Sequence, residues 1–415
     1  METRAGSRIF AMVAGEDSGD LLGAELIEAL RANHADAKFV GVGGPRMRAA
    51  GLDAWHDIAE LSVMGLAEVL RHLPRLLRLR ASLAKRLIAL RPDAFVGIDA
   101  PDFNFGLEKK LKRAGIPTVH YVSPSIWAWR ENRAEKIGKS TDTMLCLFPM
   151  EPPLYAKHGV NARFVGHPLA DRFPLAPDRD AARRELGLAA DARVLAVLPG
   201  SRLSEIHRLG AIFLAAAQRV AAEIPGLQIV IPAANPRCRA ALEQLIGRAG
   251  TGDREQGGTM ATSNTATVPR SPFPAPRLLD GQAHRAMMAA DVVLLASGTA
   301  ALEAMLAKRP MVVGYHIAPF THALVKGLGM LKTNLYALPN VLAGRMLVPE
   351  RMQRDCTPEK LADAVIALFR DKHQRNELIH EFERMHLALH KGGGAAASAA
   401  RAIDDALATP SDAVS

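Results

Sequence analysis

The sequence has few cysteines and few aromatic residues, and it has no long apolar run. Its 415 residues include three cysteines, which lie far apart and form no CxxC pair, so neither a disulfide framework nor a zinc site is indicated. The first residues do not resemble a signal peptide, and no run approaches the roughly 20 apolar residues of a membrane span. We therefore expect a protein of the reducing cytoplasm that meets membranes only from their surface.

Several nucleotide and metal motifs are also missing. The chain has no GxxxxGK[ST] loop, no GxGxxG followed by an acid at the usual distance, and no HExxH. The only DxD-like triplet, Asp178-Arg179-Asp180, lies away from the expected strand ends, so no metal and no other cofactor is expected. Basic residues do not alternate with aromatic ones along a strand, which argues against nucleic-acid binding.

The chain contains ample apolar residues and an excess of positive charge. Apolar residues make up 49% of it, and the formal net charge is +9. The length suits two domains. The charge favours anionic partners such as anionic lipids or phosphorylated substrates, although a merely soluble basic surface explains it equally well.

Short apolar strands alternate with helical segments along most of the chain. The first series of expected strands lies at 8–14, 37–42, 93–99, 116–122, 142–148 and 161–165, and the second at 193–198, 227–232, 291–296 and 310–315. Such alternation predicts parallel sheets with helices on both faces. We therefore predict an α/β protein with two Rossmann-like domains facing across a cleft and ligands at the carboxyl ends of the strands.

The predicted domains are residues 1–170 and 187–356, joined by a linker at 171–186 that is rich in proline and charge. Residues 249–276 are rich in Gly, Ser, Thr and Pro, which predicts a mobile insertion in the second domain. Residues 357–415 are predicted to be helical, beginning with Thr357 as the N-cap. Whether these helices pack back on the first domain is left open.

The stretch ASGTAALE places a glycine between two hydroxyl residues where a strand ends and a helix begins. Ser297, Gly298 and Thr299 would present backbone N–H groups to an anion. Glu303, one turn later, could accept hydrogen bonds from ribose hydroxyls. The alternative is an ordinary helix start with Thr299 as its N-cap; we favour the anion site.

The loop PGSR at 199–202 joins a strand to a helix in the same way. Arg202 is suited to bidentate contact with phosphate, with Ser201 beside it. Alternatively, Ser201 or Ser204 caps the helix and Arg202 is simply solvated. Two such loops in one half of the chain predict a bound nucleotide diphosphate there.

Two acids follow the expected strand at 93–99. Asp99 or Asp102 could act as a general base, but Asp102 is better explained as a helix N-cap. Asp99 is thus the catalytic candidate, with a catalytic and a non-catalytic role equally open. In the same region His120 is expected to be a core residue.

Two further stretches suggest contact with sugar or lipid. Trp127 and Trp129 lie beside Arg130 and Arg133 and either line a sugar or lipid site or anchor a loop in the core. Residues 63–91 interleave leucines with arginines around Pro74, which should kink the helix or begin a second one. We expect core packing at 83–90 and membrane contact at 63–77. The predicted membrane-facing residues are Val63, Met64, Leu66, Val69, Leu70, Arg71, Leu73, Arg75, Leu76, Leu77 and Arg78.

Nine segments, in order across about 350 residues, together resemble the lipid-A-disaccharide synthase family. They are AGEDSGD, GVGGPRM, VMGLAEVL, GIDAPDFN, YVSPSIWAWR, VGHP, LPGSR, ASGTAALE and LPNVLAGRMLVPE. The resemblance implies an inverting glycosyltransferase of the GT-B architecture that works without a metal. It would join UDP-2,3-diacylglucosamine to 2,3-diacylglucosamine 1-phosphate, giving a β-1,6-linked disaccharide 1-phosphate and UDP in lipopolysaccharide biosynthesis.

The resemblance also implies roles for particular residues. Asp99 would deprotonate the acceptor hydroxyl, while Arg202 and the helix dipoles stabilise the departing UDP. The further donor contacts it implies are Asn340, Glu350 and Gln353. The acceptor-side residues are Glu16, Ser18, Met64 and Trp127. The acids of AGEDSGD would then accept hydrogen bonds from sugar hydroxyls. Ser18 or Asp17 would also cap the first helix.

Two alternatives stay open on the sequence alone. One is another GT-B enzyme acting on a UDP-sugar, either an epimerase or a different glycosyltransferase, which would not need the leucine–arginine strip. The other is a non-enzymatic protein that binds anionic lipid at a membrane surface. Under the favoured interpretation the protein is cytoplasmic and peripherally attached to the inner leaflet of the inner membrane, whose anionic lipids suit its charge. Whether it forms a homodimer is not decided.

Overall fold

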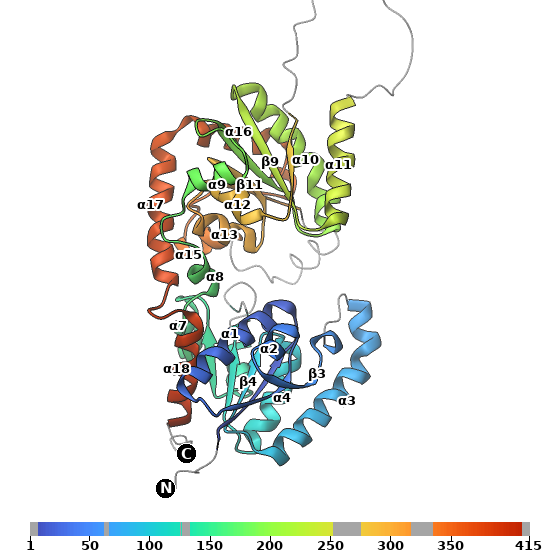
Figure 1. The fold of residues 1–415 in the computed structure, drawn as a ribbon, viewed down its shortest axis with the longest axis vertical. Coiled ribbons are helices and arrows are strands. Elements are labelled where there is room, and N and C mark those ends of the chain that lie inside the picture. Colours follow the sequence, from blue (N-terminus) through green and yellow to red (C-terminus); the bar gives the residue numbers. More distant parts are fainter. Residues whose placement is uncertain are drawn as a thin grey trace, which may run out of the picture. The chain divides into compact units, whose positions relative to one another are not determined.

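The computed structural model describes residues 7–61, 66–124, 126, 133–251, 275–316 and 335–408. The chain forms two compact units, each built around one sheet (Figure 1). Unit 1 comprises residues 1–172 and 388–415, and unit 2 comprises residues 173–387. The C-terminal end of the chain therefore belongs to the same unit as the N-terminus.

Unit 1 contains a seven-stranded sheet with the order β3-β2-β1-β4-β5-β6-β7. Its strands are β1 (Ile9–Ala14), β2 (Lys38–Val42), β3 (Leu52–His56), β4 (Ala94–Ile98), β5 (Thr118–Tyr121), β6 (Thr143–Cys146) and β7 (Asn161–Phe164). Its helices are α1 (Asp17–Asn33), α2 (Pro45–Ala49), α3 (Leu66–Leu90), α4 (Pro101–Arg113), α6 (Arg133–Gly138), α7 (Glu151–Ala156), α8 (Pro168–Arg172) and α18 (Ala395–Ala408). The strand order reverses between β1 and β4, the kind of switch point at which open α/β sheets bind ligands.

Unit 2 contains a six-stranded sheet with the order β10-β9-β8-β11-β12-β13. Its strands are β8 (Arg193–Leu198), β9 (Leu227–Ala233), β10 (Arg277–Asp280), β11 (Val292–Ala296), β12 (Met311–Tyr315) and β13 (Glu350–Met352). Its helices are α9 (Arg179–Glu185), α10 (Leu203–Glu223), α11 (Pro236–Thr251), α12 (Ala283–Ala289), α13 (Thr299–Leu306), α15 (Leu338–Ala343), α16 (Pro358–Arg370) and α17 (Lys372–Leu389), whose last two residues belong to unit 1. Here the switch point lies between β8 and β11.

The predicted α/β class with two parallel sheets is confirmed. All ten predicted strands are present, and neighbouring strands pair in parallel, for example β1 with β4 and β8 with β11. Three short strands were not predicted, namely β3, β10 and β13, and each lies at the edge of its sheet. Edge strands are covered on fewer sides, so their sequences lack the continuous apolar run that marks a central strand.

Helices from distant parts of the chain cover the two faces of the unit 1 sheet. On one face Leu26 of α1 packs in the same core cluster as Ile403 of α18, and Figure 1 shows these two helices side by side. On the other face Leu87 of α3 packs with Leu107 of α4. The C-terminal helix α18 is therefore part of the unit 1 core.

The observed units differ from the predicted domains in two ways. Residues 357–387, which include α16 and most of α17, lie in unit 2 rather than in a separate helical tail. Thr357 is the N-cap of α16 as predicted, since its side chain accepts a hydrogen bond from the Lys360 amide. The boundary between the units, after Arg172, falls within the predicted linker at 171–186, but the later part of that range forms α9 and is built into unit 2.

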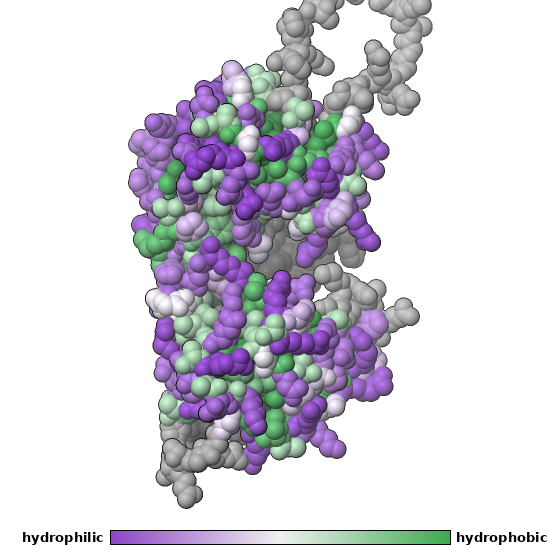
Figure 2. Space-filling model, viewed as in Figure 1, coloured by the Kyte–Doolittle hydropathy of each residue, from purple (hydrophilic) through white to green (hydrophobic). Residues whose placement is uncertain are grey.

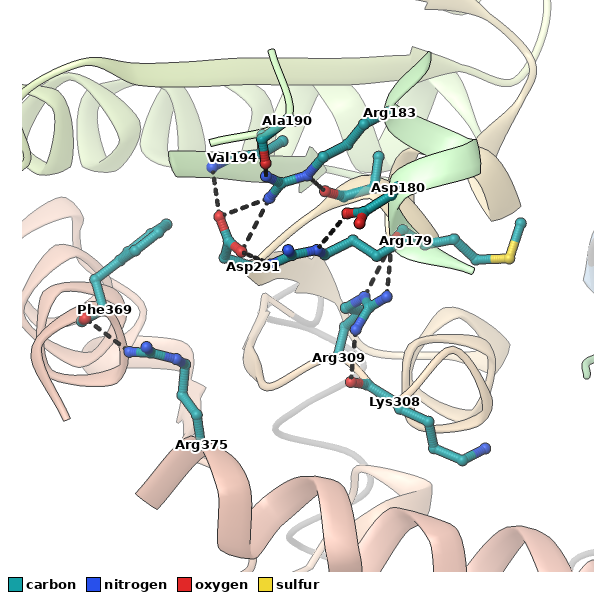
Figure 3. Close-up of polar contacts among 12 residues, drawn as sticks. Arg179, Asp180, Arg183, Ala190, Val194, Asp291, Lys308, Arg309, Phe369 and Arg375 are labelled. Atoms are coloured by element: carbon teal, nitrogen blue, oxygen red, sulfur yellow. Dashed lines mark hydrogen bonds and ion pairs between the residues drawn. The ribbon is translucent and has the colours of Figure 1, made fainter. Parts of the chain in front are cut away.

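A buried arginine attaches α9 to the sheet of unit 2. Arg183 is 1% exposed, and its Nη2 lies 2.9 Å from Asp291 Oδ2. Asp291 also accepts a hydrogen bond from the Val194 amide, so the carboxylate links the starts of β8 and β11 to α9. Figure 3 shows Arg179 reaching the same carboxylate. This ion-pair network explains why a charge-rich stretch is structured.

Helix α3 runs without a break through Pro74, so of the two effects expected of this proline, the start of a second helix is absent. Leu83 and Leu87 are 2% and 1% exposed, which confirms core packing there, but Ile88 and Leu90 are 41% and 37% exposed, so the predicted core packing does not extend to residue 90. Leu73 and Leu77 are 41% and 45% exposed. Val63 and Met64 lie outside the described residues, as do the side chains of 66–71. Among the helices that the structure describes, none is long and apolar enough to cross a bilayer.

Candidate functional site

The carboxyl ends of the central strands in unit 2 border a cavity of about 450 Å³. Residues 200–202, which follow β8, and residues 297–299, which follow β11, both line it. The cavity thus lies at the switch point of the sheet, where ligands of open α/β folds bind. The structure brings the two predicted anion loops together in one pocket of a size that suits a small ligand.

The first turn of α13 presents unpaired backbone donors beside this cavity. The helix follows Gly298, whose φ of 152° is accessible to glycine but rarely to other residues. Among the described residues, no acceptor is bonded to the N–H groups of Gly298, Thr299 or Ala300. The alternative of Thr299 as N-cap is wrong, because Gly298 holds that position and has no side chain. Free N–H groups at the positive end of a helix favour an anion.

Glu303 lies one turn into α13 and lines the same cavity. Its Oε2 is 3.5 Å from Nε2 of His284, and its side chain is 19% exposed. The His284 ring in turn contacts Phe173, with ring centroids 4.7 Å apart. The carboxylate is therefore held at the cavity wall while keeping acceptor capacity for hydroxyl groups of a ligand.

The PGSR loop differs from the predicted anion site because a carboxylate of the chain already occupies the helix start. Glu205 Oε2 accepts hydrogen bonds of 2.8 Å from the Ser201 amide and 3.2 Å from the Arg202 amide. Neither Ser201 nor Ser204 caps α10, whose N-cap is Arg202. The Arg202 side chain is 71% exposed and reaches Glu205 at only 3.8 Å. The guanidinium, rather than the loop backbone, is thus free to meet an anion.

Two of the implied donor residues are used to hold the backbone of unit 2. Asn340 is fully buried; its Oδ1 accepts hydrogen bonds from the amides of Leu347 and Val348, both 2.7 Å. Its Nδ2 donates to Glu350 Oε1 at 2.7 Å, and that carboxylate also accepts from the Ala337 amide. Gln353 has a positive φ of 52°. None of the three lines the 450 Å³ cavity.

In unit 1, Asp99 lies at the carboxyl end of β4, beside the switch point. Asp99 and Ala100 both have positive φ angles, 51° and 45°, which is uncommon for residues other than glycine. The Asp99 side chain is partly exposed, and in the described part of the chain it makes no hydrogen bond or ion pair. Asp102 is not the N-cap of α4, since Ala100 holds that position. Strained backbone of this kind is found preferentially at functional sites.

The acids of AGEDSGD have different surroundings. Asp20 is buried and accepts hydrogen bonds from the amides of Gly44, Arg46 and Met47, so it holds the start of α2. Glu16 and Ser18 are exposed. Glu16 is the N-cap position of α1, and no side chain caps that helix, so the expected caps Asp17 and Ser18 are wrong. Of the residues in this segment, Glu16, Asp17 and Ser18 are exposed and accessible to a ligand.

The two loops of unit 1 contact each other at the switch point. A Cβ on Gly15 would lie 2.6 Å from Cβ of Ala100, so only glycine fits at residue 15. The loop after β1 and the loop after β4 are therefore adjacent, and Glu16 and Asp99 come from the same edge of the sheet. Met64, Trp127 and Trp129 lie outside the described residues.

His120 is a core residue, as expected. It is fully buried, and its Nδ1 lies 2.7 Å from Glu108 Oε1. Burial raises the pKa of Glu108, and the neighbouring His120 opposes that shift. Within the described residues, no group of three or more His, Cys, Asp or Glu side chains could hold a metal ion.

Sequence reasoning missed three residues that shape these sites: Asp20, Asn104 and Glu205. Glu205 could have been found, because an acid three residues after the N-cap is the spacing of a capping box. Asp20 and Asn104 bond to backbone groups that are distant in sequence, which no local pattern reveals.

Comparison with known proteins identifies relatives over almost the whole chain. The family model described as lipid-A-disaccharide synthetase matches residues 10–252 and 276–403. A lipid-A-disaccharide synthase of Xanthomonas campestris is 55% identical over 397 residues, covering 96% of this chain and 86% of the relative. One from Xylella fastidiosa is 52% identical, covering 96% and 97%. The residues left out between the matched stretches fall within the predicted insertion.

Solved structures share the fold at much lower identity. A putative UDP-N-acetylglucosamine 2-epimerase from Listeria monocytogenes has a TM-score of 0.59 at 13% identity, covering 97% of this chain and 96% of that chain. An Anabaena protein crystallised with UDP and glucose has a TM-score of 0.51 at 13% identity, covering 97% and 100%. These neighbours show the GT-B fold, while the sequence relatives set aside both alternatives left open above. The chain belongs to the lipid-A-disaccharide synthase family, whose members are hexosyltransferases of lipid A biosynthesis.

Proposed function

We propose that the protein transfers a 2,3-diacylglucosamine unit from UDP to the 6-hydroxyl of 2,3-diacylglucosamine 1-phosphate. Membership of the family supports this reaction. One observation supports the assignment of residues. The strained turn at Asp99 lies at the switch point of the unit 1 sheet, and the N–H groups without acceptors at the start of α13 lie at the switch point of the unit 2 sheet. The products are the β-1,6-linked disaccharide 1-phosphate and UDP.

On the donor side, UDP binds in the cavity of unit 2. The N–H groups at the start of α13 donate hydrogen bonds to the diphosphate oxygens, and Ser297 and Thr299 add hydroxyl donors. Glu303 accepts hydrogen bonds from the ribose hydroxyls. Arg202 stabilises the negative charge that develops on UDP as the bond to the sugar breaks. Because these groups supply the positive charge, the reaction proceeds without a metal ion.

On the acceptor side, Asp99 is the general base. Its carboxylate takes the proton of the 6-hydroxyl while that oxygen bonds to the anomeric carbon of the donor. The bond from that carbon to the diphosphate breaks, and UDP leaves with the electron pair. Attack from the face opposite UDP inverts the configuration. Glu16 and Ser18, which are exposed beside this loop, bind hydroxyls of the acceptor sugar.

Asn340 and Glu350 contribute to the donor side by holding the segment from Ala337 to Val348 in shape. Their polar atoms are occupied by this segment, so they act through its backbone. Gln353 is proposed as a direct contact to the donor sugar, as the family resemblance implies, and its Nε2 has no hydrogen-bond partner among the described residues.

The first half of α3 is proposed to dock on the anionic surface of the inner membrane. Leu73 and Leu77 are exposed, and Arg75 and Arg78 are exposed between and beside them. Figure 2 shows hydrophobic and hydrophilic residues interspersed on the visible face of unit 1. Leucines that enter the headgroup region with flanking arginines are typical of a surface-bound helix. Replacing Leu73 and Leu77 by serine should release the protein from anionic vesicles in sedimentation, while binding unchanged from wild type would contradict this docking.

The reaction is tested by measuring UDP release from the two acylated sugars. We expect UDP and the disaccharide in equal amounts, and only when both substrates are present. Conversion of the donor alone into another UDP-sugar, or binding of both lipids without UDP release, would contradict the proposed reaction.

A further inference from the structure

Val122, the residue that follows β5, has a strained backbone conformation. Its φ is 83°, which is an outlier for a β-branched side chain. The Asp99 amide donates a 2.8 Å hydrogen bond to the carbonyl of Tyr121, the residue just before Val122. The strained turns after β4 and β5 are thus joined directly. Any shift of the β5 turn would reach the backbone of Asp99.

A buried hydroxyl pair lies next to this turn. The Ser123 Oγ is 3.0 Å from the Tyr155 hydroxyl, and the two residues are 7% and 0% exposed. The same Oγ donates to the Pro124 carbonyl at 3.1 Å. The hydroxyl of Tyr155, which belongs to α7, therefore fixes the side chain of Ser123.

Glu151, also in α7, is a further buried polar group near this turn. It is 1% exposed, and its Oε2 accepts a 3.1 Å hydrogen bond from the Phe148 amide. Burial raises the pKa of Glu151 to about 7, whereas the hydrogen bond from the Phe148 amide opposes the shift. Tyr155 of this short helix thus bonds directly to Ser123, while Glu151 of the same helix bonds to the Phe148 amide. A core that needed only to be filled would not require three buried polar groups here.

We propose that Tyr155, acting through Ser123, is a positioning residue that keeps Val122 in its strained conformation and thereby sets the orientation of Asp99. Conformations of this kind persist only where the surrounding structure enforces them. The path runs from α7 to Ser123, through Val122 and Tyr121, to the amide of Asp99. The inference rests on the proposed role of Asp99 as the base.

The test uses Ser123→Ala in two backgrounds. In the wild-type background we expect kcat to fall about 10- to 100-fold, since a displacement of about 1 Å at a reacting group has effects of that size. The KM of the UDP-sugar should stay within about twofold, because the donor binds in unit 2. In a Val122→Gly background the loss should largely disappear, since glycine adopts a positive φ without strain.

Thr143→Val is the matched control. Thr143 is 2% exposed at the opposite end of the neighbouring strand β6 and accepts a hydrogen bond from Asn161. This variant should keep the wild-type kcat even if its melting temperature falls as much as that of Ser123→Ala.

The outcomes separate the inference from the function on which it rests. An unchanged kcat in Ser123→Ala, or a loss that Val122→Gly does not relieve, would overturn the positioning role. If Asp99→Asn retained wild-type turnover, the proposed base would be refuted, whatever Ser123→Ala did.

Discussion

The side-chain nitrogen of Asn104 donates a 2.8 Å hydrogen bond to the backbone oxygen of Asp99. The same nitrogen lies 3.2 Å from the backbone oxygen of Val13, near the end of β1. Asn104 is fully buried in the first turn of α4. The Asn104 amide thus connects the ends of β1 and β4, the two strands that flank the switch point of unit 1. It also stabilises the strained turn at Asp99.

Replacing Asn104 by alanine should therefore impair turnover more than binding. The carbonyls of Val13 and Asp99 would lose their donor, which costs about 1–3 kcal/mol of stability and frees the Asp99 turn. We expect kcat to fall about 10- to 100-fold, with the KM of the UDP-sugar little changed. Steady-state kinetics of UDP release measure both. Thr141→Val, which removes another buried hydrogen-bonding side chain of unit 1, should lose stability but keep kcat; a similar loss of kcat in both variants would argue against a specific role.

Arg202→Ala should weaken the binding of UDP. Its guanidinium is exposed at the cavity, while the nearby backbone donors are already bonded to Glu205. Loss of a charge-assisted contact of about 1.5–3 kcal/mol corresponds to about 10- to 100-fold weaker binding in calorimetry. Arg208, which lies on α10 outside the cavity lining and donates to the Ser204 carbonyl, provides the control. Equal effects of Arg202→Ala and Arg208→Ala would indicate general electrostatics instead.

His167 should make the protein less stable in mild acid. Burial, with a smaller effect of Arg172, lowers the pKa of His167 from 6.5 to about 4. Between these values the unfolded chain binds a proton that the folded protein does not, so stability falls as the pH drops through this window. The loss between pH 7 and pH 5 should be about 2 kcal/mol.

The measurement compares urea unfolding of the wild type with that of His167→Asn at both pH values. Asparagine keeps an acceptor for the Leu169 amide, which bonds to His167 Nδ1 at 3.1 Å. The stability difference between the two proteins should change with pH by about the same 2 kcal/mol. A difference that does not depend on pH would show that His167 titrates equally in both states.

The central strands and the two loops that border the cavity of unit 2 could be located from the sequence because the relevant signals are local. A run such as VVLLA is apolar on both faces, and the SGT triplet directly follows it. The strand β13 has only three residues and pairs with a single neighbouring strand, β12. Its sequence therefore lacks the apolar run that marks a central strand. The charged stretch around α9 looked like a linker because its key contact, from Arg183 to Asp291, spans more than a hundred residues.

The candidate sites show the same division. Asp99 and Arg202 could be singled out from the strand ends that they follow. Their orientation depends on partners that cannot be inferred locally, such as Asn104 for Asp99. The expected N-caps at Asp17 and Asp102, and the alternative N-cap at Thr299, are wrong for a related reason. Each helix begins one or two residues earlier than expected. The N-cap of α1 is Glu16 in an extended conformation, that of α4 is Ala100 in a left-handed conformation, and that of α13 is Gly298 with a positive φ.

The most direct test of the account is the rate of UDP release by Asp99→Asn with both acylated sugars present. Asparagine has nearly the same shape as aspartate but cannot take up the proton of the acceptor hydroxyl. We predict that kcat falls about 100- to 10,000-fold, while the melting temperature and the affinity for UDP stay close to those of the wild type. Turnover near the wild-type rate in this correctly folded variant would contradict the assignment of Asp99 as the base.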